Sequence, residues 1–146
     1  METNNIYQLF TSDSVDKKSC IEVQLGKQKK KRFKDTSIFF SPEGFGPLEQ
    51  TIWDNFREYS SNSTVKISSK EWAKIVVGLQ ELSVLLKDKT YNKELLSILG
   101  FKSLDMKQMY EVNFTTINLS VDKMLQSFIA WIEPNLKDND FITING

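Results

Sequence analysis

Histidine is absent from this chain of 146 residues, and cysteine occurs once, at Cys20. Histidine is the commonest general base and the usual partner of a serine or cysteine nucleophile, so its absence excludes the familiar hydrolase triads. It also removes the ligands of nearly all zinc and copper sites, and one cysteine cannot replace them. We therefore expect no catalytic activity, no metal site and no cofactor.

The chain also lacks the marks of a secreted or membrane protein. A single cysteine excludes an intramolecular disulfide, which suits a reducing compartment. Residues 1–5 are polar and contain no apolar core of a secretory signal. No apolar run approaches the ~20 residues that a membrane-spanning helix needs. We expect a cytoplasmic protein that makes no membrane contact.

Length and composition are those of one globular unit. Hydrophobic residues make up 40% of the chain and charged residues 26%, close to the average for globular domains. We expect a single globular domain over residues 1–146. Residues 1–19 are polar and irregular except for a few apolar positions near Tyr7, and this stretch is a candidate for a loosely ordered arm.

The hydrophobic pattern predicts an α+β fold. Helices are expected where apolar residues recur at spacings of three and four, in residues 47–59, 69–87, 91–99 and 120–133. Strands are expected where residues alternate or are β-branched and aromatic, in residues 21–25, 32–40, 64–68, 112–119 and 141–144. The predicted architecture is a small antiparallel sheet packed against three or four helices.

Large aromatic residues are the candidate core and the candidate anchors. Residues 41–47 contain two prolines and two glycines and are expected to form a loop, which would carry Phe45. Phe45 either anchors a partner or closes over the core, and both interpretations stay open. The three tryptophans are expected in the core, with Trp131 the farthest from its apolar stripe and thus the most exposed.

Charge is unevenly distributed along a chain that is neutral overall. Residues 1–34 hold eight basic and four acidic residues, a net charge of +4, so the remainder carries −4. Most of the excess lies in segment 27–34, where the candidate phosphate-binding side chains are Lys27, Lys29, Lys30, Lys31 and Arg32. One interpretation is an accessory protein that binds nucleic acid. The other, which we favour, is a solvated hairpin or an edge strand guarded by lysines.

Acidic residues gather on the helix expected after the proline loop, with only Arg57 to oppose them. Asp54 and Glu58 are four residues apart and would share a helical face. A carboxylate pair could catalyse a reaction only in contrasting, buried environments, so a patch for a basic partner is favoured. The candidate partner-binding residues are Glu43, Phe45, Glu49, Trp53, Asp54 and Glu58.

The order of features in residues 35–86 resembles small bacterial immunity proteins. Residues 35–40 lead into Ser41-Pro42-Glu43-Gly44-Phe45; a helix with Leu48, Ile52 and Phe56, the short segment 64–68 and a helix bearing Trp72 follow. Proteins of this kind accompany polymorphic toxins, including those of contact-dependent growth inhibition. The resemblance implies a cytosolic, non-catalytic inhibitor that binds one cognate toxin domain, often a nuclease. It carries over no catalytic residues, and it leaves the oligomeric state open.

Overall fold

The computed structural model describes residues 6–26, 34–61, 63–88, 93–101 and 103–146. Within these residues the elements are, in chain order, β1 (Ile21–Leu25), β2 (Ile38–Phe40), α1 (Pro42–Asn55), β3 (Thr64–Ser68), α2 (Ser69–Leu86), α3 (Lys93–Leu99), α4 (Leu104–Asn135) and β4 (Phe141–Asn145). The described residues thus form a four-stranded antiparallel sheet and four helices. This confirms the predicted α+β fold.

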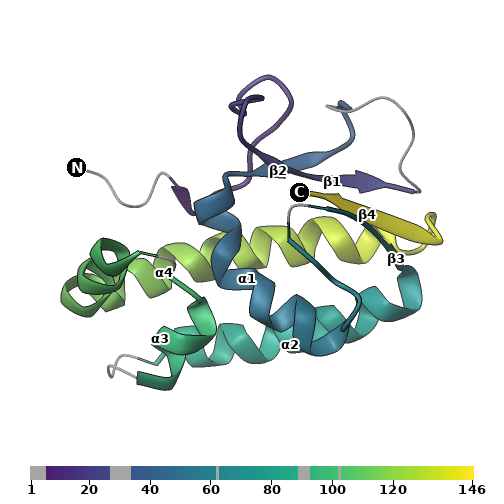
Figure 1. Cartoon of the computed structure of the whole chain (residues 1–146). Coiled ribbons are helices and arrows are strands. Elements are labelled where there is room, and N and C mark those ends of the chain that lie inside the picture. Colours follow the sequence, from purple (N-terminus) through teal and green to yellow (C-terminus); the bar gives the residue numbers. More distant parts are fainter. Residues whose placement is uncertain (1–5, 27–33, 62, 89–92, 102) are drawn as a thin grey trace.

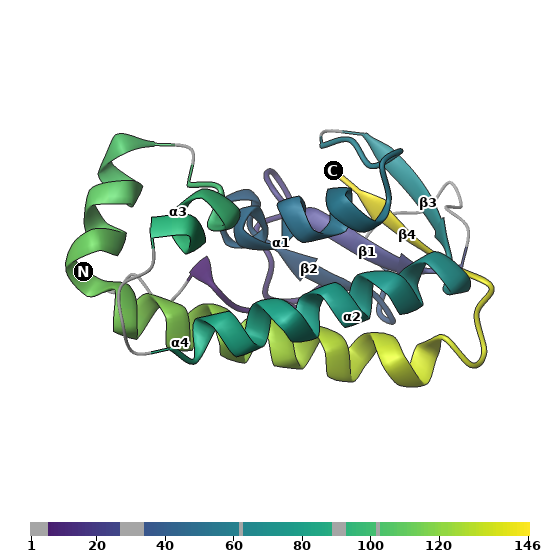
Figure 2. The same cartoon turned by 90° about the horizontal axis from the view of Figure 1, so that it is seen from below.

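The sheet has the strand order β2-β1-β4-β3, with every neighbouring pair antiparallel. The last strand along the chain therefore lies inside the sheet, between β1 and β3. The helices lie on one side of the sheet, and residues 11–20 form a loop that rises on the other side (Figure 1). Seen from below, α2 and α4 run side by side in opposite directions beneath the sheet (Figure 2).

The core lies between the sheet and the helices and is centred on Phe128 of α4. Its ring makes edge-to-face contacts with Phe40 at 5.1 Å and with Trp72 at 5.9 Å between ring centroids. The indole N–H of Trp72 donates to the carbonyl of Ile142, 3.0 Å away, so it fastens α2 to β4 inside the core. Trp72 is fully buried, as predicted, and Trp131 is half-buried.

The expected loop at residues 41–47 is wrong, because helix α1 already begins at Pro42. The Ser41 hydroxyl oxygen accepts the N–H of Gly44 at 3.0 Å, which caps the helix, and Pro42 follows at a position where proline loses no helical hydrogen bond. Pro47 lies inside the helix and is tolerated there. The helix ends at Asn55, so Glu58 is not on it.

The expected strand at residues 112–119 is also wrong, because these residues belong to α4. Ser103 caps this helix through the N–H of Met106, and the helix bends at Asn113, where φ is −124° and ψ is 30°. The fully buried Val121 and Leu125 continue a four-residue spacing from Ile117, so the apolar face of the helix reaches into the β-branched segment. Burial of that face outweighs the β propensity of the segment.

Two further predictions cover the start of the chain. The strand expected at 32–40 is shorter, since Lys34 to Ser37 form a turn and β2 starts at Ile38; residues 27–33 lie outside the described residues. In the segment considered as a loose arm, Tyr7 is buried, and Phe10 exchanges backbone hydrogen bonds of 2.8 and 2.9 Å with Phe39.

No helix in the described part of the chain is long and apolar enough to cross a membrane.

Candidate protein-binding surface

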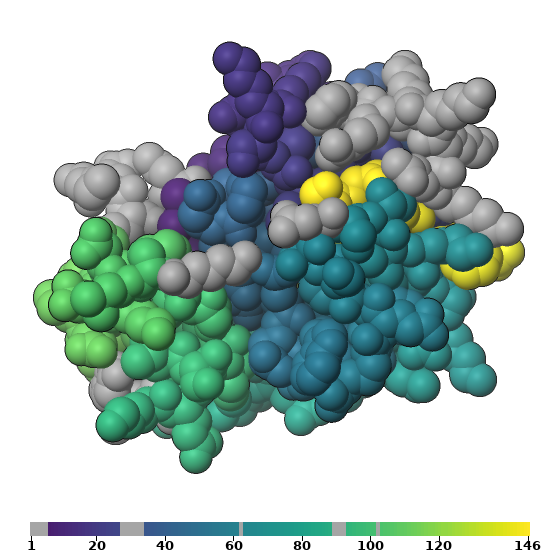
Figure 3. Space-filling view, viewed as in Figure 1, coloured from purple at the N-terminus to yellow at the C-terminus, as the bar shows by residue number. Residues whose placement is uncertain are grey.

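Helix α1 crosses one face of the molecule and remains partly uncovered there (Figure 3). Of the six predicted partner-binding residues, four have exposed side chains: Glu43, Trp53, Asp54 and Glu58. Glu43 stands in the first turn of the helix and Asp54 in the last, about 16 Å apart at the helical rise. The exposed residues therefore lie at the two ends of helix α1 and in the turn that follows it.

Phe45 is not part of this surface. Its side chain is fully buried, and its ring packs edge-to-face against Phe40 at 5.0 Å and faces Phe128 at 6.4 Å. Because the preceding chain is helical rather than a loop, Phe45 points toward the sheet. Of the two interpretations of this ring, the structure selects the one in the core.

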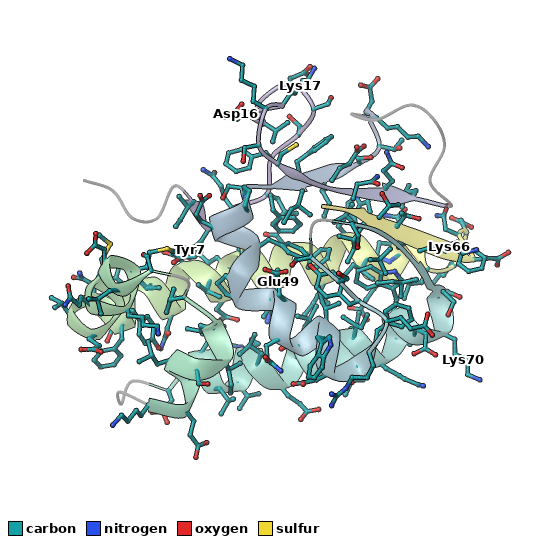
Figure 4. All side chains as sticks on the ribbon, viewed as in Figure 1. Tyr7, Asp16, Lys17, Glu49, Lys66 and Lys70 are labelled. Atoms are coloured by element: carbon teal, nitrogen blue, oxygen red, sulfur yellow. The ribbon has the colours of Figure 1, made fainter. Side chains whose placement is uncertain are left out.

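Glu49 is half-buried and engaged within the protein. The Tyr59 hydroxyl donates to Glu49 Oε2 across 2.8 Å, linking helix α1 to the chain that leaves it. Burial raises the pKa of Tyr59, and the neighbouring Glu49 carboxylate raises it further by opposing a second negative charge. Figure 4 shows Lys17 in the loop before β1, and Lys17 and Glu49 line the same hollow between that loop and α1.

Trp53 is the exposed tryptophan, with 41% of its surface accessible, so the expectations that Trp53 lies in the core and that Trp131 is the most exposed of the three are wrong. The guanidinium of Arg57 lies 3.9 Å from the ring centroid of Trp53, so the cation expected to oppose the acidic patch instead covers one face of the indole. Next to this pair, the amide of Gln50 donates to Asp54 Oδ1 at 2.9 Å. Arg57 therefore restricts the indole of Trp53, and Gln50 orients the neighbouring carboxylate of Asp54.

The end of helix α1 decides where Glu58 lies. The N–H of Phe56 returns to the carbonyl of Ile52 at 2.8 Å, and the chain then turns so that Tyr59 is buried and Glu58 exposed. The predicted sharing of one helical face by Asp54 and Glu58 is therefore wrong. Both carboxylates nonetheless lie at the same end of α1.

Among the described residues, three hollows lie against helix α1. One of about 220 Å³ is bounded by Glu49, Gln50, Trp53, Tyr59 and Ser61. A second, of about 270 Å³, shares Glu49, Tyr59 and Ser61 with the first and reaches the loop that contains Lys18 and Cys20. The third, of about 350 Å³, lies at the start of the helix against the chain between α3 and α4. A helix flanked by hollows offers a contoured surface rather than a flat one.

The structure adds residues that the sequence did not single out. Tyr59 orients Glu49, Gln50 orients Asp54, and Gly46 lines the third hollow. Nothing in the sequence signalled this role of Gly46, because the two prolines and two glycines of residues 41–47 predicted a loop. The long-range approach of Tyr59 to Glu49 also left no trace in the pattern.

The basic candidates Lys27, Lys29, Lys30, Lys31 and Arg32 lie outside the described residues. Lys34, at the end of that segment, is described, and its backbone N–H donates to Glu22 Oε2 at 3.1 Å. Glu22 is fully buried in the sheet. The described part of the basic segment is thus attached to a buried carboxylate of β1.

The acidic residues and the single cysteine are the side chains that could hold a metal ion in this chain without histidine. Within the described part of the chain, no three residues among the acids and cysteine are grouped as ligands for a metal ion. Cys20 is partly exposed rather than buried as a small core residue. In comparisons with known proteins, the chain matches no family model, no curated protein and no solved structure.

Proposed function

We propose that this protein is a non-catalytic inhibitor, an immunity protein of the cytoplasm, which neutralises a cognate bacterial toxin by binding it through helix α1. The observation that carries the proposal is Trp53, exposed at 41% and held by Arg57 beside the carboxylates of Asp54 and Glu58. Tryptophan is among the residues most enriched at the energetic centres of protein interfaces. Its exposure on a helix otherwise lined with polar groups favours a protein partner.

The charge of the surface indicates the partner's chemistry. Glu43, Asp54 and Glu58 are exposed carboxylates, and Arg57, next to Glu58 in the sequence, is engaged with Trp53. Complementary charge speeds association and selects the partner. A toxin that acts on nucleic acid presents a basic groove to its substrate, and an acidic helix would compete for that groove. A nuclease toxin therefore suits this face best.

The test uses the toxin domain encoded beside the gene for this chain. Cells that produce both proteins should grow, and the purified proteins should form a complex. Trp53→Ala should weaken binding about 30-fold or more, because truncation of such an anchor costs at least about 2 kcal/mol. The triple variant Glu43→Lys, Asp54→Lys, Glu58→Lys should lose protection.

A matched control carries the same change of charge away from α1. Glu81→Lys, Glu111→Lys, Glu133→Lys alters three exposed carboxylates on α2 and α4 and should keep protection. Equal loss of binding in both triple variants would show that net charge, not this face, matters. A gene without a neighbouring toxin, or a toxin that kills in the presence of this protein, would contradict the proposal.

The alternative partner, nucleic acid, is separated by a gel-shift experiment with random DNA and RNA. A basic segment that binds phosphates gives affinity that falls steeply with salt. Under the proposed function we expect no shift at about 0.15 M salt. A salt-sensitive shift that disappears when Lys27, Lys29, Lys30, Lys31 and Arg32 are changed to glutamine would instead support the accessory protein.

A further inference from the structure

The largest of the three hollows beside α1 is lined mostly by apolar residues. It encloses about 350 Å³ and is formed by Pro42, Gly46, Pro47, Leu99, Phe101 and Met106. Its walls come from the start of α1 on one side and from the end of α3 and the start of α4 on the other. This volume is at the lower end of the range for ligand pockets and suits a single large side chain.

Gly46 keeps this pocket open. A Cβ placed on Gly46 would meet only the carbonyl oxygen of Gly100, at 3.9 Å, which is an ordinary contact. The other glycine of the helix, Gly44, is different, because a Cβ there would collide with the carbonyl oxygen of Ile6. Packing therefore explains Gly44 but not Gly46. A side chain at position 46 would fill the pocket, and its absence leaves room for an atom group from outside.

The walls differ in rigidity. Phe101 is buried and packs against Tyr110 with 5.0 Å between ring centroids, so this wall is fixed from behind. Met106 is only partly buried, and methionine adapts its shape to what it contacts. The pocket thus has a firm aromatic side and one adjustable side, a combination that accommodates an inserted apolar group.

The border of the pocket also carries a negative charge. Glu43 is the one charged residue among the described lining residues, and its side chain is exposed. A carboxylate at the border of an apolar pocket favours an occupant with a cation close to its apolar part. Glu43 also belongs to the acidic surface of α1, so the pocket and that surface can meet one partner together.

We propose that this pocket receives one aromatic or long aliphatic side chain from a basic protein partner, with a neighbouring lysine or arginine of that partner facing Glu43. The inference deepens the proposed function and rests on it for the identity of the partner as a protein. The pocket would hold the anchor at the start of α1, while Trp53 is the protein's own anchor near the other end of the helix.

The experiment measures binding of two short peptides to the full ¹⁵N-labelled chain by NMR titration. The probes are N-acetyl-Phe-Arg-amide and N-acetyl-Phe-Glu-amide. The arginine peptide should cause saturable shifts in the amides of residues 43–46 and 99–106, with a Kd on the order of 1 mM, as expected for so small a ligand. The glutamate peptide should bind several-fold more weakly, because its carboxylate meets Glu43.

Variants separate the pocket from the rest of the surface. Gly46→Leu should abolish the shifts by filling the pocket, and Gly46→Ala, which adds only a methyl group, should weaken binding at least threefold. Glu43→Gln should remove the preference between the two peptides. Glu133→Gln is the control and should leave both titrations unchanged, since Glu133 is exposed near the far end of α4 and does not line this pocket.

The inference fails if neither peptide gives saturable shifts, if both bind equally to the unmodified chain, or if Gly46→Leu and Gly46→Ala bind as the unmodified chain does. These outcomes do not depend on a toxin. If the protein protects cells but binds neither peptide, the proposed function stands and the proposed role of the pocket is wrong. If the protein binds the arginine peptide but neutralises no toxin, the binding preference of the pocket stands and the proposed toxin partner is wrong.

Discussion

The hydroxyl of Tyr59 and the carboxylate of Glu49 are the pair that holds the exit from α1 in place. Their 2.8 Å hydrogen bond spans ten residues of sequence and lies at the border of two hollows. A carboxylate engaged in this way is a poorer partner for an external cation than the exposed Glu43 or Asp54. The acidic surface is therefore carried by the residues near the two ends of the helix.

Two buried tyrosines should make the protein sensitive to alkaline pH. Burial raises the pKa of Tyr7 from 10.0 to about 12, and burial together with Glu49 raises that of Tyr59 as well. Below pH 10 both phenols are protonated in the folded and unfolded states, so their contribution to stability is complete. Above pH 10 the unfolded chain releases protons that the folded protein retains, so stability falls as pH rises toward 12.

Urea unfolding at pH 9 and pH 11 measures this effect. The unmodified protein should lose about 1 kcal/mol of unfolding free energy at pH 11 for each of Tyr7 and Tyr59. Tyr7→Phe and Tyr59→Phe should each remove their share of the loss, whatever their effect at pH 9. A double variant with the same alkaline loss as the unmodified protein would refute the assignment.

Helix α1 combines features that local rules treat as helix breakers. Its first six residues include two prolines and two glycines, yet Ser41 caps it and the core takes up Phe45, Leu48 and Ile52 on one side. The burial of this apolar side stabilises the helix enough to offset Pro47. The glycines then serve separate purposes: one admits the backbone of Ile6, and the other leaves a pocket beside Gly100.

The two glycines of α1 should respond oppositely to the same substitution. Gly44→Ala should destabilise the protein by about 2 kcal/mol or more, because the new methyl group displaces the backbone at Ile6. Gly46→Ala should be neutral or stabilising by up to about 1 kcal/mol, since alanine favours the helix and meets no close neighbour. Thermal unfolding of both variants compares them directly, and equal destabilisation would contradict the distinction.

Across the whole chain, charge of the two signs is unevenly distributed along the sequence. The basic excess belongs to the first 34 residues, and most of it falls in residues 27–33, which lie outside the described residues. Exposed carboxylates accompany α1. A neutral chain can therefore still orient itself toward a basic partner as the two approach.

Salt should slow association with the cognate toxin. Raising ionic strength from about 0.05 M to about 0.5 M should lower the association rate constant roughly tenfold, with little change in the dissociation rate. The variant Glu43→Lys, Asp54→Lys, Glu58→Lys should show a weaker or inverted salt dependence in stopped-flow mixing. If the association rate constant of the unmodified protein does not change with salt, electrostatic steering by the carboxylates at α1 is ruled out.

Sequence patterns alone were enough to predict the class of fold and the elements whose pattern repeats cleanly. The alternation in β3 and the apolar stripe of α2 after Ser68 needed no tertiary information, because a local period directly reflects burial on one face. The alternation of β1 also predicted a strand, but Glu22 and Gln24 are buried as well, so that strand is covered on both faces. The sequence also placed Trp53, Asp54 and Glu58 among the candidates for binding. Their side chains are exposed, and their binding role stays a prediction.

The remaining assignments depended on contacts that exist only in the folded protein. Residues 112–119 were predicted to be a strand, and packing of α4 against the core made them helical instead. Phe45 could be an anchor or part of the core, and contact with Phe40 and Phe128 selected the core. The bond from Tyr59 to Glu49 and the pocket at Gly46 arise between segments apart in sequence. A local pattern cannot specify such contacts, because the partner that buries or binds a side chain is brought to it only by folding.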